Sequence, residues 1–370
     1  MTQRVPARVG DPVEAIETPA LVLVLDAFER NLDAMAAAAK AAGLRLRPHA
    51  KAHKTPAIAH AQLARGAVGV CCQKTDEALA FIETGIADVL VTNEVIEPAK
   101  LQRLARAARG ARIGILVDSL PGVEIASQAA SDAGVTLDIY VEVEVGAGRC
   151  GVAPGVAGAL ASHAAAMPGL RFAGLHCYHG GAQHKRTPAE RSAAIAGAAE
   201  GARAAVASVE RAGLACAIVT GAGTGSWPNE RDSQVWNELQ VGSYVFMDAD
   251  YARNVPGPAD LRFEQSLFVL ASIMSLPAAD RAVCDAGLKA FAFDSGLPLV
   301  HRRAGLTYAK ASDEHGTLAV QRGEPPWLGE RLWLVPGHCD PTVNLYDWIV
   351  GVRADRVETV WPVTARGALG

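Results

Sequence analysis

The chain has 370 residues, of which half are apolar and a fifth are charged, and its formal net charge is −4. A chain of this length exceeds what one compact core usually holds, so we expect one large domain and a smaller one. The absence of a basic bias argues against a nucleic-acid partner, and no apolar run approaches the roughly twenty residues that a membrane helix needs.

The N-terminal residues and the cysteines indicate the cellular compartment of the protein. Residues 1–18 lack the apolar stretch of a secretory signal. The seven cysteines are odd in number and irregularly spaced, which argues against a disulfide framework. We therefore expect a cytoplasmic protein, and we interpret the adjacent Cys71 and Cys72 as small core residues. Thr18–Leu25 is the first predicted strand.

From Phe28 to Glu264, helical stretches and short apolar strands alternate. Eight strands separated by helices indicate a parallel sheet, and their number favours a closed (β/α)8 barrel of the TIM type over an open sheet. The predicted strands are Leu44–Arg47, Val68–Cys72, Asp88–Val91, Ile113–Val117, Leu137–Val143, Phe172–Tyr178, Ala217–Thr220 and Leu239–Val245. The helices between them include Phe28–Ala42, Thr55–Arg65, Asp76–Thr84, Pro98–Arg109 and Pro188–Ala212.

After Glu264 the sequence changes to short segments rich in Val, Leu and Trp, broken by Pro, Gly and Asp. This pattern predicts an antiparallel β-domain. We expect Thr18–Leu25 to join it, so that the barrel spans residues 28–264 and the β-domain combines residues 1–27 with 265–370. The predicted strands are Ser266–Ser275, Arg281–Asp285, Leu318–Gln321, Leu332–Val335, Trp348–Val352 and Arg356–Trp361.

The segment that follows the first barrel strand, Arg47 to Lys54, contains three basic residues and two histidines. Barrel enzymes keep their catalytic groups at such strand ends. Neighbouring positive charges favour a lysine in its neutral form, which can attack a carbonyl and hold it as a Schiff base. Lys51 is therefore a candidate nucleophile, with a solvated basic turn as the alternative.

Two further strand ends carry candidate polar side chains. Arg149 follows the fifth strand among glycines, where a guanidinium can approach an anion or a phenolic oxygen, although a surface arginine is the alternative. The sixth strand ends in His176, Tyr178 and His179, followed by Gly180. Two histidines and a tyrosine at a barrel rim favour a functional site over satisfied core residues.

A glycine-rich loop, Gly221–Ser226, follows the seventh strand. Backbone N–H groups at glycines can converge on a phosphate, and Thr224 or Ser226 can add a hydroxyl. Barrels often bind phosphate after their seventh and eighth strands, so this place favours a phosphate site over a plain turn. The loop lacks the lysine of a Walker motif, and its place in the chain is wrong for a dinucleotide fingerprint.

The β-domain contains the segment Pro336–Thr342, in which His338 and Asp340 flank Cys339. In an extended chain residues i and i+2 point the same way, so His338 and Asp340 would form a nitrogen–oxygen pair with Cys339 facing away. Such a pair suits Mn, Mg, Co or Zn, and only two protein ligands would leave positions for water or substrate. Pairing through Cys339 instead would favour Zn.

Together, these segments resemble the pyridoxal 5'-phosphate (PLP) enzymes of the alanine racemase fold, fold type III. The resemblance is to the branch that holds D-threonine aldolase, D-serine dehydratase and D-threo-3-hydroxyaspartate dehydratase. It implies a barrel with a β-domain, PLP as cofactor and a head-to-tail homodimer. It covers nearly the whole chain and rests on Thr18–Leu21, Arg47–Lys54, Cys71–Lys74, Gly148–Val152, Tyr178–Gly180, Gly221–Ser226, Asp285–Lys289 and Pro336–Thr342.

The resemblance also implies roles for individual residues. Lys51 corresponds to the lysine that carries PLP, and His338 with Asp340 corresponds to the His-x-Asp metal pair of the aldolase type. The neighbouring Cys339 keeps the His-x-Cys pair of the D-serine dehydratase type open. The other implied cofactor-binding residues are Gln73, Arg149, Tyr178, Gly223, Thr224, Gly225 and Tyr244.

We therefore expect a D-threonine aldolase, which cleaves the Cα–Cβ bond of small D-β-hydroxy-α-amino acids to glycine and an aldehyde. PLP stabilises charge at the α-carbon, and a divalent ion can polarise the hydroxyl. We assign the base that takes the hydroxyl proton to His179, with His184 and His176 as competing candidates. The alternatives are a D-serine or D-threo-3-hydroxyaspartate dehydratase, which releases a keto acid and ammonia, or a non-catalytic PLP-binding protein.

Overall fold

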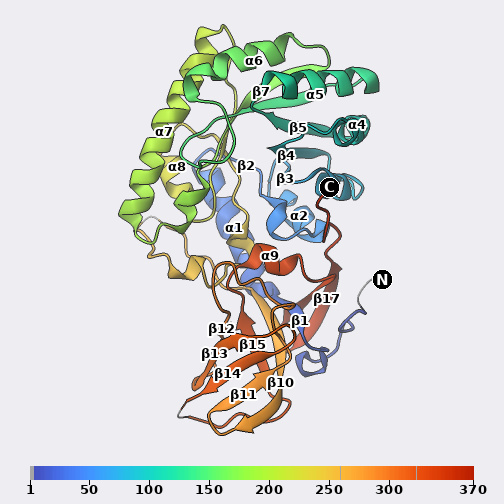
Figure 1. The fold of residues 1–370 in the computed structure, drawn as a ribbon, viewed down its shortest axis with the longest axis vertical. Helices are drawn as coiled ribbons and strands as arrows, with labels where there is room; N and C mark the ends of the chain where they lie inside the picture. Colours follow the sequence, from blue (N-terminus) through green and yellow to red (C-terminus); the bar gives the residue numbers. More distant parts are fainter. Residues whose placement is uncertain (1–3, 259, 322) are drawn as a thin grey trace.

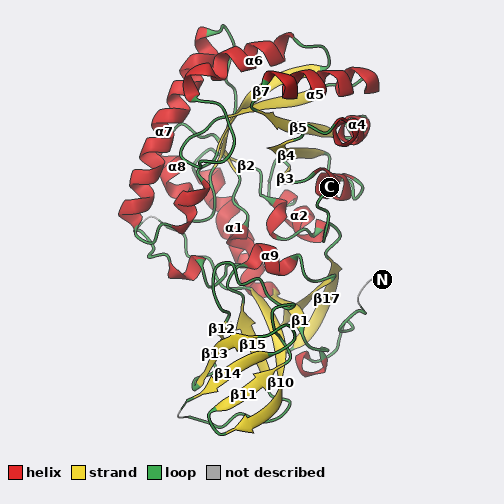
Figure 2. Cartoon of the chain, viewed as in Figure 1, coloured by secondary structure: helices red, strands yellow, loops and turns green. Residues whose placement is uncertain are grey.

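The computed structural model describes residues 4–258, 260–321 and 323–370 of the chain, so residues 1–3 of the predicted segment 1–27 lie outside it. In Figure 1 the helices and the strands from β2 to β9 occupy the upper part of the molecule, and β10 to β17 occupy the lower part. Figure 2 shows the same division by element type, with most helices around the upper sheet. The strand β1, Ala20–Val24, belongs to the lower part.

The upper sheet consists of eight parallel strands in the order β2-β9-β8-β7-β6-β5-β4-β3. Its two ends also meet, because His49, just after β2, bridges to Cys71 in β3 and the Cys71 N–H donates to the Pro48 carbonyl oxygen. The sheet therefore closes, which confirms the predicted (β/α)8 barrel. Its strands are β2 Arg45–Leu46, β3 Val70–Cys72, β4 Asp88–Glu94, β5 Arg112–Val117, β6 Leu137–Glu142, β7 Leu170–Cys177, β8 Val219–Gly221 and β9 Glu238–Leu239.

Helices cover the outside of the barrel. The longest helix begins with a capping box, since the Thr187 side chain accepts from the Glu190 N–H and Glu190 accepts from the Thr187 N–H. Thr55, which precedes α2, makes no side-chain cap, because its hydroxyl donates to the His53 carbonyl oxygen. The helices are α1 Leu25–Ala41, α2 Pro56–Leu63, α3 Thr75–Ile82, α4 Pro98–Ala107, α5 Leu120–Ala133, α6 Ala157–Ala166, α7 Pro188–Arg211 and α8 Trp227–Ser233.

The last barrel strand is shorter than predicted. The apolar run Leu239–Val245 was expected to be one strand, but β9 ends at Leu239 and a 3₁₀ turn, η5 Ser243–Val245, follows. The N–H groups of Phe246 and Met247 both donate to the Ser243 carbonyl oxygen, which turns the chain away from the sheet. The other 3₁₀ turns of the described chain are η1 Val13–Ala15, η2 Ala50–Ala52, η3 Pro154–Val156, η4 Gly180–His184 and η6 Tyr251–Arg253.

The lower sheet contains nine strands, and it confirms that the N-terminal strand joins the C-terminal β-domain. β1 lies between β10, to which it is antiparallel, and β16, to which it is parallel. The predicted antiparallel β-domain is confirmed, with this one parallel pair as the exception, because no hairpin turn fixes the direction of a strand that comes from far away in the chain. The strands are β10 Leu267–Ala278, β11 Arg281–Cys284, β12 Leu299–Val300, β13 Leu306–Ala311, β14 Gly316–Val320, β15 Arg331–Val335, β16 Trp348–Arg353 and β17 Arg356–Pro362, and the short helix α9 covers Cys339–Val343.

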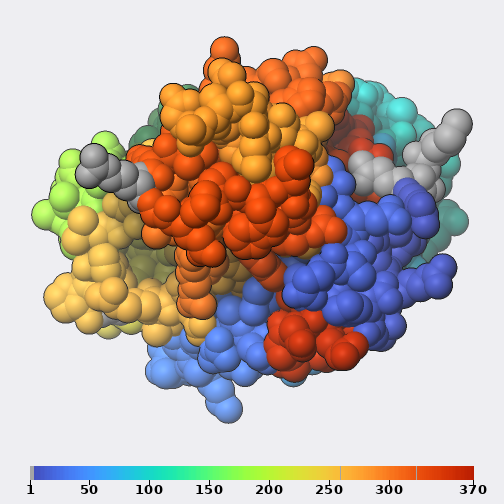
Figure 3. Space-filling view, turned by 90° about the horizontal axis from the view of Figure 1, so that it is seen from below, coloured from blue at the N-terminus to red at the C-terminus, as the bar shows by residue number. Residues whose placement is uncertain are grey.

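The space-filling view from below shows the N-terminal segment in blue beside the red end of the chain and the orange strands (Figure 3). Backbone hydrogen bonds join these segments, from the Gly10 N–H to the Val357 carbonyl oxygen and from the Val13 N–H to the Asp355 carbonyl oxygen. The N-terminal segment therefore packs on the β16–β17 hairpin. None of the described helices combines the length and the apolar character that crossing a membrane requires.

Candidate active site

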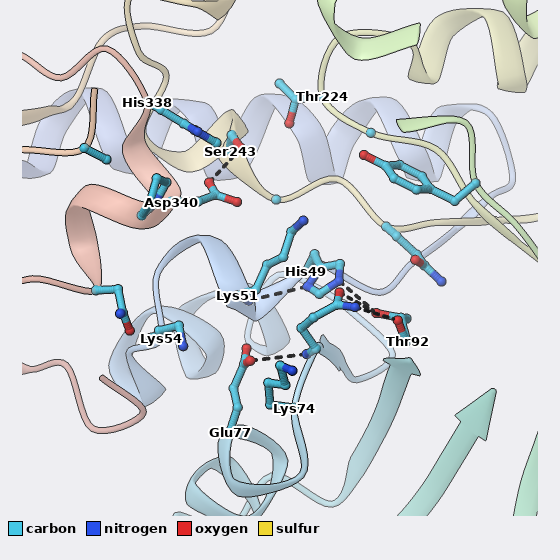
Figure 4. A pocket seen from close by; sticks show the side chains of 18 of the residues that line it. His49, Lys51, Lys54, Lys74, Glu77, Thr92, Thr224, Ser243, His338 and Asp340 are labelled. Atoms are coloured by element: carbon cyan, nitrogen blue, oxygen red, sulfur yellow. Dashed lines mark hydrogen bonds between the residues drawn. The ribbon is translucent and has the colours of Figure 1, made fainter. Parts of the chain in front are cut away.

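A cavity of about 710 Å³ opens where the carboxyl ends of the barrel strands face α9 of the β-domain. This is the end of the barrel at which catalytic groups are expected. Three of the predicted residues, His179, Gly225 and Tyr244, do not line it. Eight of them do, namely Lys51, Gln73, Arg149, Tyr178, Gly223, Thr224, His338 and Asp340. Figure 4 shows Lys51 near the middle, with His338 and Asp340 on one side and His49 on the other.

Lys51 lies in the 3₁₀ turn that follows β2, and its side chain forms no ion pair within the described residues. Two of the cations predicted beside it, Arg47 and Lys54, are engaged with other groups. Arg47 directly follows β2, but its guanidinium binds Asp88 at 2.6 Å and Glu238 at 3.0 Å, which are the first residues of β4 and β9. Lys54 donates to the Ala365 carbonyl oxygen at 3.4 Å. Lys51 is therefore placed by the turn and not by neighbouring charge.

The wall beside Lys51 is a hydrogen-bonded polar layer. His49 Nε2 lies 2.9 Å from the Thr92 hydroxyl, and its Nδ1 accepts from the Lys51 N–H at 3.4 Å. The Gln73 amide nitrogen donates to the Thr92 carbonyl oxygen at 3.0 Å. Burial, with a further contribution from the charge of Lys51, holds the pKa of His49 well below its usual value. His49 is therefore a neutral side chain, held in place by hydrogen bonds, that forms part of the cavity wall.

Four backbone N–H groups at the ends of β8 and β9 form a ready anion site. They belong to Gly223, Thr224, Gly242 and Ser243, all of which line the cavity. None of these N–H groups has an acceptor within the described residues. Buried N–H groups are otherwise nearly always paired, so this set fits a phosphate. Gly242 and Ser243 were not predicted, although they follow the eighth strand, where barrels often hold phosphate.

The other two predicted phosphate residues are used elsewhere. The Gly225 N–H donates to the Gln183 side-chain oxygen at 2.8 Å, so it is not free for a ligand. The Tyr244 hydroxyl accepts from the Gln62 amide at 3.1 Å, and the Tyr244 side chain is buried beneath α2. Its backbone contributes indirectly, because the Tyr244 N–H donates to the Thr224 hydroxyl at 3.0 Å and thereby joins the two loops.

Arg149 and Tyr178 lie together at the cavity. The Arg149 guanidinium is 6.0 Å from the centre of the Tyr178 ring, and one of its nitrogens is 4.0 Å from the Glu142 carboxylate. Glu142 also contacts His176, whose Nε2 lies 3.0 Å from the Gln240 side-chain oxygen. Because burial is outweighed by Glu142, the pKa of His176 is raised. His176 therefore belongs to a paired polar network and is not a free base.

His338 and Asp340 reach the cavity in a different geometry from the predicted one. The segment is not extended: His338 precedes α9, and Asp340 lies in its first turn. Asp340 accepts from the Ser243 hydroxyl at 3.1 Å, and His338 Nδ1 contacts Asp294 at 2.6 Å. Cys339 is fully buried and does not line the cavity, as predicted.

Few side chains at the cavity could serve as metal ligands. The described part of the chain holds no cluster of three or more His, Cys, Asp or Glu that could bind a metal. Because Asp294 occupies Nδ1 of His338, its Nε2 is the nitrogen left for a ligand. His338 and Asp340 can therefore offer one nitrogen and one carboxylate, and an ion held by these two would complete its shell with water or substrate.

Two histidines of the β7–α7 loop were candidates for a base, and only one of them lines the cavity. His179 packs over Gly146, where a Cβ atom would lie 3.1 Å from its Nε2. Burial lowers the pKa of His179. His184 lines the cavity, and its Nδ1 lies 2.5 Å from Asp250. The geometry therefore favours His184 over the predicted His179.

Comparison with known proteins gives the same family over nearly the whole chain. Residues 23–250 match the family described as alanine racemase, N-terminal domain, and residues 266–352 match a serine dehydratase domain. A D-threonine aldolase from Arthrobacter sp. is 49% identical over 98% of this chain and 96% of its own length. A 3-hydroxy-D-aspartate aldolase from Paracoccus denitrificans (strain Pd 1222) is 48% identical over 98% of this chain and 95% of its own length.

A solved structure agrees. The crystal structure of a D-threonine aldolase from Filomicrobium marinum is 50% identical and superimposes with a TM-score of 0.97, covering 99% of this chain and all of the other. The resemblance that the motifs indicated is therefore confirmed over the full length, including the barrel, the β-domain and the segments that line the cavity.

Proposed function

This chain belongs to the alanine racemase N-terminal domain family, in the branch of D-threonine and 3-hydroxy-D-aspartate aldolases, and from that premise we propose that it cleaves D-β-hydroxy-α-amino acids to glycine and an aldehyde. The observation that carries the proposal is one cavity lined by Lys51, by four N–H groups and by the pair His338–Asp340. Within the described residues, Lys51 forms no ion pair and the four N–H groups have no acceptor.

PLP fits the cavity. Its phosphate would take the N–H groups of Gly223, Thr224, Gly242 and Ser243, which have no acceptor in the described chain. Lys51 would hold it covalently, as the lysine at the end of the first barrel strand. Arg149, Tyr178 and Gln73 would surround its ring, as the family resemblance implies. When bound, PLP supplies an electron sink for negative charge at the α-carbon.

A divalent ion is the second component of the proposal. His338 and Asp340 would hold it, and it would act as a Lewis acid toward the substrate hydroxyl. An imidazole and a carboxylate suit Mn, Mg, Co or Zn. The burial of Cys339 away from the cavity supports the His-x-Asp pair and counts against the His-x-Cys pair of a dehydratase.

His184 is the base in this proposal, in place of His179. It would accept the proton of the β-hydroxyl, so that the oxygen electrons form the aldehyde carbonyl. The Cα–Cβ bond then breaks, its electron pair goes to the α-carbon, and uptake of one proton there gives glycine. Among the described residues only His49, His176, His184 and His338 are histidines that line the cavity, and the other three are committed to Thr92, Glu142 and Asp294.

The setting of the enzyme is also part of the proposal. We place it in the cytoplasm, which agrees with seven free cysteines. The head-to-tail homodimer that the family implies would be tested by light scattering on the purified protein.

The test of the function is product identity. The enzyme is incubated with PLP, Mn²⁺ and either D-threonine or L-threonine, and glycine, acetaldehyde, 2-oxobutyrate and ammonia are quantified. We expect equal amounts of glycine and acetaldehyde from the D-isomer alone. Formation of 2-oxobutyrate with ammonia would show that the protein is a dehydratase and not an aldolase. If PLP is bound but no product forms, the protein would be a non-catalytic PLP-binding protein.

A further inference from the structure

The Asp250 carboxylate is bound by three side chains, two arginines and a histidine. Its carboxylate is almost fully buried and receives Arg186 at 2.5 Å, Arg253, and the Nδ1 atom of His184 at 2.5 Å. Both arginines use the oxygen Oδ1, and His184 uses Oδ2. The arginines therefore prevent the carboxylate from rotating, and one oxygen is left for the imidazole.

The ionisation state of Asp250 determines which nitrogen of His184 carries the hydrogen. Burial raises the pKa of Asp250, but hydrogen bonds from Arg186 and His184 outweigh it, so that the pKa is lowered. An ionised carboxylate has no hydrogen to donate, so Nδ1 of His184 must be the donor. The lone pair of the neutral imidazole then lies on Nε2, which is the atom a general base would use.

The other nitrogen is free for the substrate. His184 lines the cavity, and its Nε2 has no hydrogen-bond partner in the described part of the chain. The Tyr251 ring packs beside the imidazole, with ring centres 6.1 Å apart. Asp250 and Tyr251 thus hold the ring from two sides.

The segment that contains Asp250 also forms backbone hydrogen bonds to the two residues before His338. The Ala249 N–H donates to the Pro336 carbonyl oxygen at 3.0 Å, and the Asp250 N–H donates to the Gly337 carbonyl oxygen at 3.2 Å. His184 and His338 are therefore positioned from one short stretch of backbone. The barrel contributes the first histidine and the β-domain the second, so this stretch fixes their relative placement.

We propose that Asp250 is the positioning residue that fixes the tautomer and the direction of His184, and that Arg186 and Arg253 lock it in place. The proposal rests on the proposed function for the use of His184 as a base, but the tautomer itself does not depend on any reaction.

The first experiment measures the tautomer in the resting holoenzyme. The protein is labelled with ¹⁵N-histidine, and the His184 signals are assigned by comparison with His184→Gln. Spectra are taken over a range of pH, and in the neutral form of the imidazole we expect nitrogen shifts that place the hydrogen on Nδ1. Signals of the opposite tautomer would overturn the proposal, whatever the activity of the enzyme.

The second experiment uses Asp250→Asn, whose side-chain amide can donate to Nδ1 and so favours the opposite tautomer. We expect kcat for glycine release to fall by about 10²-fold or more, as for loss of a general base, with PLP content, metal content and KM nearly unchanged. The matched control is Asp260→Asn, because Asp260 pairs with the buried Arg191 at 3.1 Å in the same region and does not line the cavity.

The control should keep kcat within about threefold, in line with the small effects of substitutions away from a site. A kcat for Asp250→Asn within that range of the wild type would overturn the proposal. A loss of kcat without a change in the His184 tautomer would also overturn it, since the role of Asp250 would then be structural alone. Wild-type enzyme that releases no glycine, yet has the expected tautomer, would sink the proposed function and not this arrangement.

Discussion

Two of the histidines that line the cavity, His184 and His338, are each bound through Nδ1 to an aspartate. Asp250 binds His184 at 2.5 Å, and Asp294 binds His338 at 2.6 Å. A carboxylate on Nδ1 leaves Nε2 as the outward atom in both rings, which suits a base in one case and a metal ligand in the other. The sequence spacing could not reveal this arrangement, because Asp250 and Asp294 lie far from their partners in the chain.

At the residue scale, the first prediction concerns Lys51. Borohydride reduction of the holoenzyme followed by peptide mapping should place the pyridoxyl group on Lys51. Lys54 and Lys74 line the same cavity and serve as internal controls. A label on either of these would refute the assignment. Lys51→Ala should lose the absorbance of the covalently bound cofactor and nearly all turnover.

The second prediction concerns His338 and Asp340. Chelation should abolish glycine release while PLP stays bound, because the ion would act on the substrate hydroxyl and not on the cofactor. Added Mn²⁺ or Co²⁺ should restore the activity. Asp340→Ala should behave like the chelated enzyme, and Cys339→Ser should keep most of its activity, since Cys339 is buried away from the cavity.

The reverse pattern, with Cys339→Ser inactive and Asp340→Ala active, would contradict the His-x-Asp pair. Metal content measured in both variants separates loss of the ion from loss of the fold, and activity that survives complete removal of metal would exclude a catalytic role for the ion.

At the element scale, the glycine loop after β8 is shaped by Gln183 beneath it. A Cβ atom at Gly223 would lie 2.5 Å from the Gln183 amide, and one at Gly225 would lie 2.6 Å from the Gln183 carbonyl oxygen. The Gln183 amide cannot easily move aside, because it accepts from the Gly225 N–H and donates to the Ser226 hydroxyl at 2.6 Å. These glycines therefore allow close packing of Gln183, in addition to any approach of a phosphate.

The third prediction follows from this packing. Gly223→Ala should displace Gln183 and disturb the loop at a cost of about 1–3 kcal/mol, as for other overpacked sites. Because this cost falls on the loop conformation that binds PLP, the affinity for PLP should drop by about tenfold or more. Gly197→Ala is the control, because nothing lies within 4 Å of a Cβ there. Equal PLP affinity of both variants in a fluorescence titration would contradict the role of the loop.

The pattern of the sequence predicted the barrel because alternating helices and strands repeat eight times, and it predicted Lys51, Gly223 and His338 because each lies in a short motif at an element end. It could not separate His179 from His184, which depends on how η4 turns after β7. It also missed Gly242 and Ser243, because the run Leu239–Val245 has the composition of a strand although the chain turns within it.

At the scale of the whole molecule, a network of ion pairs fills the end of the barrel opposite the cavity. Arg47 is buried between Asp88 and Glu238, and Glu238 also accepts from Arg45 at 2.9 Å. Burial raises the pKa of Glu238, but Arg47 and Arg45 outweigh it and lower the pKa below its usual value. The network joins β2, β4 and β9 across the closure of the barrel, so it supports the strand from which Lys51 follows.

The fourth prediction is that Arg47→Met destabilises the fold by about 3 kcal/mol, because it leaves the buried Glu238 charge with one partner. The lowered pKa of Glu238 stabilises the fold above the unfolded-state value of about 4.3 and is lost as pH falls through the folded-state value. The difference between wild type and variant in urea unfolding should therefore shrink near pH 3.

Arg353→Met is the matched control, since Arg353 pairs with Asp26, Glu29 and Glu358 at a partly exposed site. Such exposed pairs are screened by solvent and contribute much less to stability than a buried pair. Equal loss of stability in the two variants, or a difference that does not depend on pH, would contradict the role given to the buried network.

The most direct test of the whole account observes the bond itself. D-threonine labelled with ¹³C at both Cα and Cβ is added to the enzyme with PLP and Mn²⁺, and the one-bond coupling between the two carbons is followed by NMR. The account predicts that the coupling disappears as signals of glycine and acetaldehyde without carbon–carbon coupling grow in equal amounts, and that Lys51→Ala leaves the substrate unchanged. Retention of the coupling in a product such as 2-oxobutyrate would contradict it, because the Cα–Cβ bond would then have stayed intact.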